Sequence, residues 1–107
     1  MSVPPRSDEQ RSAALASALA ARLERARLRT DLKSRHLTGA DVVEGASANR
    51  VWAGLRVAWL LERLPGIGAV RAERMMSALQ IAPTRRIQGL GHRQRVALIA
   101  ELRREGR

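Results

Sequence analysis

Apolar and polar positions over residues 8–37 follow a helical period without interruption. The stretch contains neither glycine nor proline and consists largely of alanine, leucine and arginine. These residues favour helices because they lose little side-chain freedom there and carry no branch at Cβ. Ser7, followed by Asp8 and Glu9, is typical of a helix start, where a hydroxyl caps free amides and acids meet the positive dipole end. We therefore predict one long helix, preceded by a loose leader.

Two stripes run along this predicted helix. The apolar stripe changes face: Leu15, Leu19, Leu23 and Ala26 share one side, while Leu28 and Leu32 fall on the far side. Because each residue advances about 100° round a helix, the two halves cannot bury against the same surface. The second stripe is basic, with members spaced three, four and four residues apart: Arg22, Arg25, Arg29 and Lys33.

Shorter helices are expected in the middle of the chain. Thr38-Gly39-Ala40-Asp41 resembles a capping box and predicts a helix through Ser47, and another short helix is expected over 54–63. Trp52 and Trp59 are the only aromatic residues. They stand among valines and leucines, so we expect core packing, with stacking on nucleic-acid bases as the alternative.

Two further helices with two turns between them are predicted at the end. The first is expected over 69–79, with Val70, Met75, Met76 and Leu79 facing inward, and the last over 92–104, with Val96, Ile99 and Leu102 inward. The predicted fold is all-α: a long N-terminal helix packed on a helix-two-turns-helix, or helix–hairpin–helix-like, core. The expected boundaries are a leader at 1–7 and a single helical domain at 8–107, with the long helix at 8–37, short helices at 38–63 and the core at 64–107.

Charge points to the kind of partner. The chain holds 20 basic residues against 10 acidic ones, a net charge of +10, and all but one of the basic residues are arginine. Eight basic and four acidic residues lie in 1–37, and nine basic and three acidic in 65–107, while the middle is neutral. Such a balance indicates a polyanion, and arginine favours bidentate contacts with phosphate.

Missing residue types argue against several classes of function. Without cysteine there is no disulfide scaffold, thiolate metal site or cysteine nucleophile, and with only His36 and His92 we expect no metal and no cofactor. No apolar run approaches the roughly 20 residues of a membrane span, and the first residues do not resemble a signal peptide. We expect a cytoplasmic protein with neither a membrane partner nor a small-molecule substrate.

The segment Leu64-Pro65-Gly66-Ile67-Gly68-Ala69-Val70-Arg71-Ala72 has the pattern of a helix–hairpin–helix. Two glycines let the backbone turn and bring N–H groups close to a ligand with no Cβ in the way. These N–H groups begin the next helix, whose positive dipole end favours an anion. Such hairpins bind phosphates without reading sequence, and an ordinary interhelical turn is the alternative.

A second segment, at 83–95, repeats this chemistry. Arg85 and Arg86 precede Gly89-Leu90-Gly91, which opens a helix that carries Arg93. A solvated basic loop is the alternative, but two such segments about twenty residues apart favour one shared site for a DNA backbone. Phosphate contacts are expected from the amides of Gly66 and Gly68 and from Arg71, Arg85, Arg86 and Arg93.

Together these motifs resemble the actinobacterial integration host factor family over almost the whole chain. The likeness begins at Asp8-Glu9-Gln10-Arg11 and continues through Leu60-Leu61-Glu62-x-Leu64-Pro65-Gly66-x-Gly68. It is most specific at its end, in Ile81-Ala82-Pro83-Thr84-Arg85-Arg86, Gly89-Leu90-Gly91 and Arg93-Gln94-Arg95. The resemblance implies a nucleoid-associated protein that binds duplex DNA with little sequence preference, bends or compacts it, and in some members assists phage integration.

The resemblance also implies which residues meet DNA. The stretch 64–71 matches a lid on the duplex, and 82–94 matches the two-turn motif. The implied set is Leu64, Pro65, Gly66, Ile67, Gly68, Ala69, Val70, Arg71, Arg85, Arg86, Gln88, Gly89, Gly91 and Arg93. We expect a monomer that binds double-stranded DNA, and a phage integrase complex is the further partner that the resemblance suggests.

Three positions depart from the family pattern. Gln88 stands where a third basic residue is usual, and Gly54-Leu55-Arg56 keeps one of two expected basic residues. His92 begins a helix where Asp or Ser is common. We expect these departures to tune the affinity for DNA and not to abolish binding.

Other functions stay open. A DNA glycosylase or lyase needs a catalytic carboxylate or lysine, and Lys33, Glu73 and Glu101 stand in no recognisable catalytic context, so we expect no enzyme. An RNA- or ribosome-associated helical protein would explain the charge equally well, and so would an interaction protein whose charge serves solubility. The basic stripe at 22–33 is either a second DNA surface or a solvated helix face.

Overall fold

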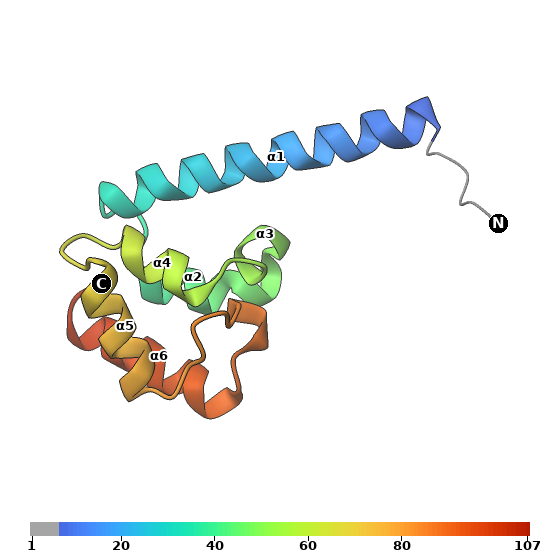
Figure 1. Cartoon of the computed structure of the whole chain (residues 1–107). Helices are drawn as coiled ribbons and strands as arrows, with labels where there is room; N and C mark the ends of the chain where they lie inside the picture. The colour runs from blue at the N-terminus through green and yellow to red at the C-terminus, as the bar shows by residue number, and fades with distance from the viewer. Residues whose placement is uncertain (1–6) are drawn as a thin grey trace.

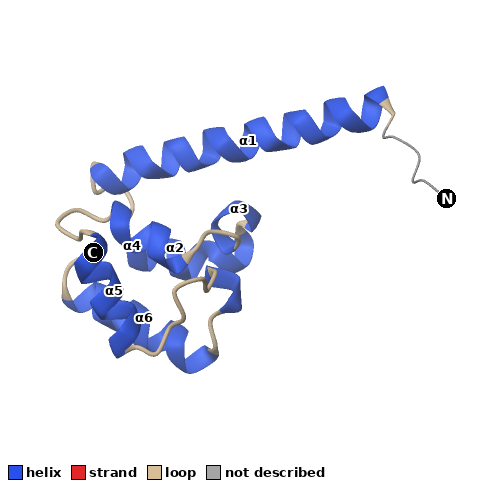
Figure 2. Ribbon diagram, viewed as in Figure 1, coloured by secondary structure: helices blue, strands red, loops and turns tan. Residues whose placement is uncertain are grey.

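The computed structural model describes residues 7–107, which form a helical body with one long helix lying across it (Figures 1 and 2). In chain order the elements are α1 (Asp8–Lys33), α2 (Gly39–Gly45), the 3₁₀ turn η1 (Ala46–Ala48), α3 (Arg50–Ala53), α4 (Val57–Arg63), α5 (Ala69–Ala78), the 3₁₀ turn η2 (Ile87–Gly89) and α6 (His92–Arg104). No strand occurs within 7–107. The all-α prediction is confirmed, and the predicted leader, apart from Ser7, lies outside the described residues.

A reciprocal capping box starts α1 as predicted. The Ser7 hydroxyl accepts the amide N–H of Gln10, whose side-chain oxygen accepts the Ser7 N–H at 2.9 Å. The helix ends at Lys33, four residues before the predicted boundary. The backbone reverses at Arg35, with a φ of +64°, and the Leu37 N–H reaches the Asp31 carbonyl at 3.1 Å. This reversal lets Thr38 take the extended conformation that caps α2.

Only the second half of α1 joins the core. Leu28 and Leu32 are buried, and the first half extends beyond the body with Leu15, Leu19 and Leu23 in solvent (Figure 1). The point at which the apolar stripe of α1 changes face therefore divides the helix into a part that packs on the body and a part that projects from it, which we call the projecting half. The remainder of the core comes from buried side chains of the short helices and turns, chief among them Val42, Val43, Val57, Leu60, Leu61, Ile87, Leu98 and Leu102.

The prediction that Val70 and Val96 face inward is wrong. Val70 is 64% exposed and Val96 is 53% exposed. In α5 the buried residues are Ala72 and Met76, and Val70 lies about 160° round the helix from Ala72. Leu98 takes the corresponding role in α6, for the same geometric reason. Of the other predicted inward residues, Met76 and Leu102 are buried, and Met75, Leu79 and Ile99 are half-buried against the core.

The helix predicted over 54–63 begins three residues later than expected, as α4, and a separate short helix, α3, precedes it. Asn49 accepts the N–H groups of Val51 and Trp52 at 3.1 and 3.2 Å and so starts α3 earlier. The chain then becomes extended at Arg56 before α4 begins. Both tryptophans are half-buried against the core, as expected.

Two substitutions in α1 test the division of this helix. We expect Leu32→Ala, at a site 1% exposed, to lower the free energy of unfolding by about 2–5 kcal/mol, since it removes buried methyl groups and leaves a cavity. Leu19→Ala, at a site 55% exposed, is the matched control and should change it by less than about 0.5 kcal/mol. Urea unfolding followed by circular dichroism measures both. Equal losses of unfolding free energy in the two variants would contradict the conclusion that the first part of α1 does not pack on the body.

Candidate nucleic-acid interface

A tight turn links α4 to α5. The N–H of Ile67 donates to the carbonyl of Leu64 at 3.1 Å, and Gly66 has a φ of +79°. Proline second and glycine third is the pattern that such a turn requires, because only glycine adopts this conformation without strain. Leu64 and Ile67 are buried on either side. The hairpin predicted at 64–68 is therefore a fixed turn with two apolar anchors.

The first amides of α5 face open space. Gly68 caps the helix with no side-chain hydrogen bond, and the first turn contains no acidic residue. A Cβ built on Gly68 would meet nothing within 4 Å. Helix N-termini leave backbone N–H groups unsatisfied and favour anions. The hairpin therefore presents donors to a group from outside the chain.

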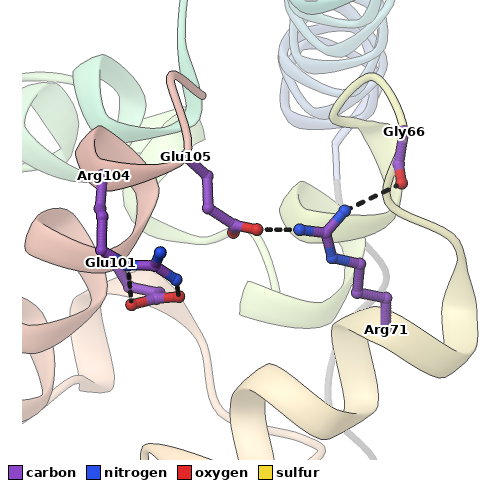
Figure 3. A network of polar contacts seen from close by, with 5 residues as sticks. All are labelled: Gly66, Arg71, Glu101, Arg104 and Glu105. Atoms are coloured by element: carbon purple, nitrogen blue, oxygen red, sulfur yellow. Dashed lines mark hydrogen bonds and ion pairs between the residues drawn. The ribbon is translucent and has the colours of Figure 1, made fainter.

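Arg71 has a partner within the chain. Its guanidinium forms an ion pair with Glu105, which follows α6, and donates to the Gly66 carbonyl at 3.5 Å (Figure 3). The Arg107 guanidinium lies under Gly66, so close that a Cβ on that glycine would stand 2.9 Å from it. The hairpin is thus braced by the residues that follow α6. A phosphate contact from Arg71 would require it to exchange partners.

The second predicted segment, at 83–95, is tied to the middle of the chain by backbone hydrogen bonds. The Val57 N–H donates to the Arg85 carbonyl at 3.0 Å, and the Ile87 N–H donates to the Leu55 carbonyl at 2.9 Å. These bonds form an isolated antiparallel bridge at Arg56 and Arg86. The backbone that carries the two adjacent arginines is consequently rigid.

The arginines of this segment contact neutral oxygens. Arg86 donates to the Gly54 carbonyl at 2.5 Å and Arg85 to the Gly89 carbonyl at 3.1 Å. Both side chains are exposed and border an open hollow, together with Thr84 and Gln88. Carbonyl contacts orient a guanidinium without neutralising its charge. The hollow is therefore positively charged.

The start of α6 completes this basic surface. Gly91 donates its N–H to the Gln94 side chain at 3.0 Å, and the same side chain donates to the Gln80 carbonyl at 2.8 Å. His92 and Arg93 are exposed in the first turn, which holds no acid. Gln94 thereby holds the helix start against the end of α5.

The two ends of α6 differ in charge balance. At its C-terminal end Arg103 pairs with Glu44 at 2.6 Å, and Arg104 pairs with Glu101 (Figure 3). The hydrogen bond from Arg104 lowers the pKa of the Glu101 carboxyl, which keeps it ionised. At the N-terminal end, no ion pair within residues 7–107 involves Arg85, Arg86 or Arg93. Of the two ends of α6, only the C-terminal one has its arginines paired with carboxylates.

The hairpin and the two-turn segment do not lie side by side. The hairpin contacts Glu105 and Arg107, beyond the end of α6, whereas the two-turn segment leads into its start (Figure 1). Thirteen helical residues separate these ends by about 20 Å. The sequence predicts one shared DNA site, which stays a prediction; in the structure its two segments lie at opposite ends of α6.

Comparison with known proteins gives the chain a family. Residues 32–102 match the S13-like H2TH domain family. An integration host factor of Mycobacterium tuberculosis is 46% identical over 99 residues, 92% of this chain and 94% of the relative. That of Streptomyces coelicolor is 44% identical over 105 residues, 98% of this chain and 94% of the relative. The chain belongs to the actinobacterial integration host factor family.

A solved structure supports the same assignment. It is described as sIHF bound to an 8-bp palindromic DNA. It matches with a TM-score of 0.76 and 39% identity, over 81% of this chain and 98% of that one. The resemblance inferred from the motifs, including the helix-two-turns-helix core, is thereby confirmed.

Some contributors to the site escaped sequence reasoning. Arg71 and Glu105 form an ion pair although they are 34 residues apart in the sequence, and no local sequence pattern predicts this contact. Arg56 pairs with Arg86 in an isolated bridge thirty residues along the chain, a contact that the family pattern at Gly54-Leu55-Arg56 does not indicate. Within 7–107 no helix is long and apolar enough to cross a membrane.

Two glycine substitutions test the hairpin. We expect Gly66→Ala to lower the free energy of unfolding by about 1–2 kcal/mol, because it strains a left-handed residue and crowds Arg107. Gly68→Ala is the control: it has ordinary backbone angles and open space, so stability should be unchanged or slightly higher. Thermal unfolding of both variants measures the difference, and a larger loss for Gly68→Ala would refute the geometry.

Proposed function

We propose that this chain binds the phosphate backbone of duplex DNA, largely without sequence preference, as a non-enzymatic architectural protein of the nucleoid. The observation that carries the proposal is the rigid, unneutralised cluster of Arg85, Arg86 and Arg93 at the start of α6. Its support is the family of relatives named integration host factor and the similar structure described as bound to DNA.

On binding DNA, phosphates would replace the neutral carbonyl oxygens that the arginines of the two-turn segment now contact. Arg85 and Arg86 now donate to backbone carbonyls, so binding costs no ion pair. Charge-assisted bonds to phosphate are stronger than bonds to a neutral carbonyl. The dipole of α6 adds to the attraction at its first turn. Contacts of this kind position a protein on DNA without reading bases.

Bending or compaction would follow from two separated surfaces. The hairpin and the two-turn segment lie about 20 Å apart along α6, so each would meet a different stretch of backbone. A body that holds two such stretches favours bent or bridged duplexes. We propose the basic stripe of α1 as an additional surface, and assistance to phage integration as a consequence of the shaped DNA.

A pair of arginine substitutions tests whether the arginine cluster at the start of α6 binds DNA. We expect Arg85→Ala with Arg86→Ala to weaken binding to unrelated duplexes alike, by about 10- to 100-fold, and to reduce the salt slope by about 2. The control pair, Arg103→Ala with Arg104→Ala, changes the net charge equally where the arginines are already paired with carboxylates. Its effect should be several-fold smaller. Fluorescence anisotropy at a series of salt concentrations measures both, and equal losses would mean that only total charge matters.

Salt dependence and competition test the class of ligand. With about six phosphates neutralised, affinity for duplex DNA should fall roughly 10³-fold between about 50 and 200 mM salt. Structured RNA should compete less well than duplex DNA of equal length. The family description as S13-like keeps RNA binding as the alternative. A strong preference for RNA would replace DNA with RNA in the proposal, and a flat salt response would remove both.

A further inference from the structure

The projecting half of α1 carries an unpartnered apolar stripe. Leu15, Leu19 and Leu23 are each more than half exposed, and they are three of the five large apolar side chains exposed within 7–107. Their spacing of four places them on one face over about 12 Å of helix. Single exposed leucines are ordinary, but a contiguous stripe indicates a binding surface.

Arginines flank this stripe. By helical geometry Arg11 and Arg22 lie along one side of the leucines and Arg27 along the other. The stripe also lies nearly opposite Leu28 and Leu32, which pack on the body, about 160° away round the helix. A straight helix therefore cannot turn these leucines onto its own molecule.

A groove of complementary character lies between α4 and α5. Its volume is about 420 Å³, and its apolar lining includes Ala58, Met76, Ile81 and Pro83. Two carboxylates also line it: Glu73, and Glu62, which lies 3.8 Å from the Arg63 guanidinium. In a chain with a net charge of +10, the groove thus offers acidic side chains to a basic partner.

We propose that the leucine stripe of α1 docks into the α4–α5 groove of a second copy of this chain. The two surfaces match in chemistry: leucines between arginines would meet an apolar floor beside two glutamates. Complementary charge of this kind fixes the register of a contact and disfavours other partners.

This contact joins two different surfaces, so it propagates. Each molecule would use its stripe for one neighbour and its groove for another, which gives open-ended rows and not closed pairs. Three leucines bury far less than the roughly 1,200 Å² of a stable interface, so the contact is weak. Molecules on the same duplex raise each other's local concentration, and rows would form there first.

Sedimentation velocity without DNA tests the contact separately from DNA binding. The wild-type chain should associate progressively as its concentration rises to about 1 mM, the range in which weak contacts form. The triple variant Leu15→Gln, Leu19→Gln, Leu23→Gln, which keeps the net charge, should stay monomeric. The Glu73→Arg variant, which changes the groove instead of the stripe, should also stay monomeric. A wild-type chain that is monomeric throughout overturns the proposal.

Mixing the two variants decides between interfaces. The leucine variant retains a groove and the Glu73→Arg variant retains a stripe, so together they should form pairs that do not grow. Association that is lost in the leucine variant but kept by Glu73→Arg would mean that α1 pairs with α1, which also overturns the proposal. Circular dichroism confirms folding, and unchanged affinity of the leucine variant for a short duplex that holds one molecule separates this contact from DNA binding.

A charge exchange provides the last check. Arg22→Glu alone should weaken association by about 10-fold or more, as Glu73→Arg does, because each places like charges together. Both substitutions in one chain restore opposite charges, and association should recover. No recovery would mean that Arg22 and Glu73 do not face each other, against the docking proposed here.

Discussion

Two backbone hydrogen bonds, from Val57 to Arg85 and from Ile87 to Leu55, tie the two-turn segment to the middle of the chain. Without them the connection between α5 and α6 would be a thirteen-residue loop, free to move. With them its backbone is fixed, Ile87 enters the core, and the side chains of Arg85 and Arg86 are aimed outward. The rigid presentation of the basic hollow depends on this short bridge.

The positions of the glutamates decide which arginines are neutralised at each end of α6. Glu44, Glu101 and Glu105 gather near the C-terminal end of α6 and pair with arginines there. The pairs with Glu44 and Glu105 brace α2 and α5 against α6, and the pair with Glu101 lies within α6. The opposite end of α6 is left with arginines whose contacts are carbonyls. The arginines at the C-terminal end of α6 therefore serve the fold, while Arg85, Arg86 and Arg93 at its start have no carboxylate partner within residues 7–107.

Local chemistry made much of this predictable. The capping boxes at Ser7 and Thr38, the glycine turn at Gly66 and the bounds of α6 all depend on neighbouring residues. The change of face along α1 was likewise visible in its leucines.

What escaped prediction depends on contacts between distant residues. Hydrophobicity alone favours Val70 over Ala72 as the inward residue of α5, but in the structure Ala72 is buried and Val70 is exposed. The bridge at Arg56 and the pair between Arg71 and Glu105 join positions about thirty residues apart. That the two glycine-bearing segments lie at opposite ends of α6 likewise depends on packing, which local sequence patterns do not show.

The central claim is that backbone phosphates bind at two particular places, the hairpin at 64–68 and the two-turn segment that leads into α6, and not wherever arginines lie. Titration of the isotopically labelled chain with a short duplex of arbitrary sequence, followed by amide chemical shifts, tests it most directly. The account predicts that the largest shifts fall at Gly66–Val70 and at Thr84–Arg93, and that a second unrelated duplex gives the same pattern. Shifts spread evenly over all arginine-bearing helices, or absent from both segments, would contradict it.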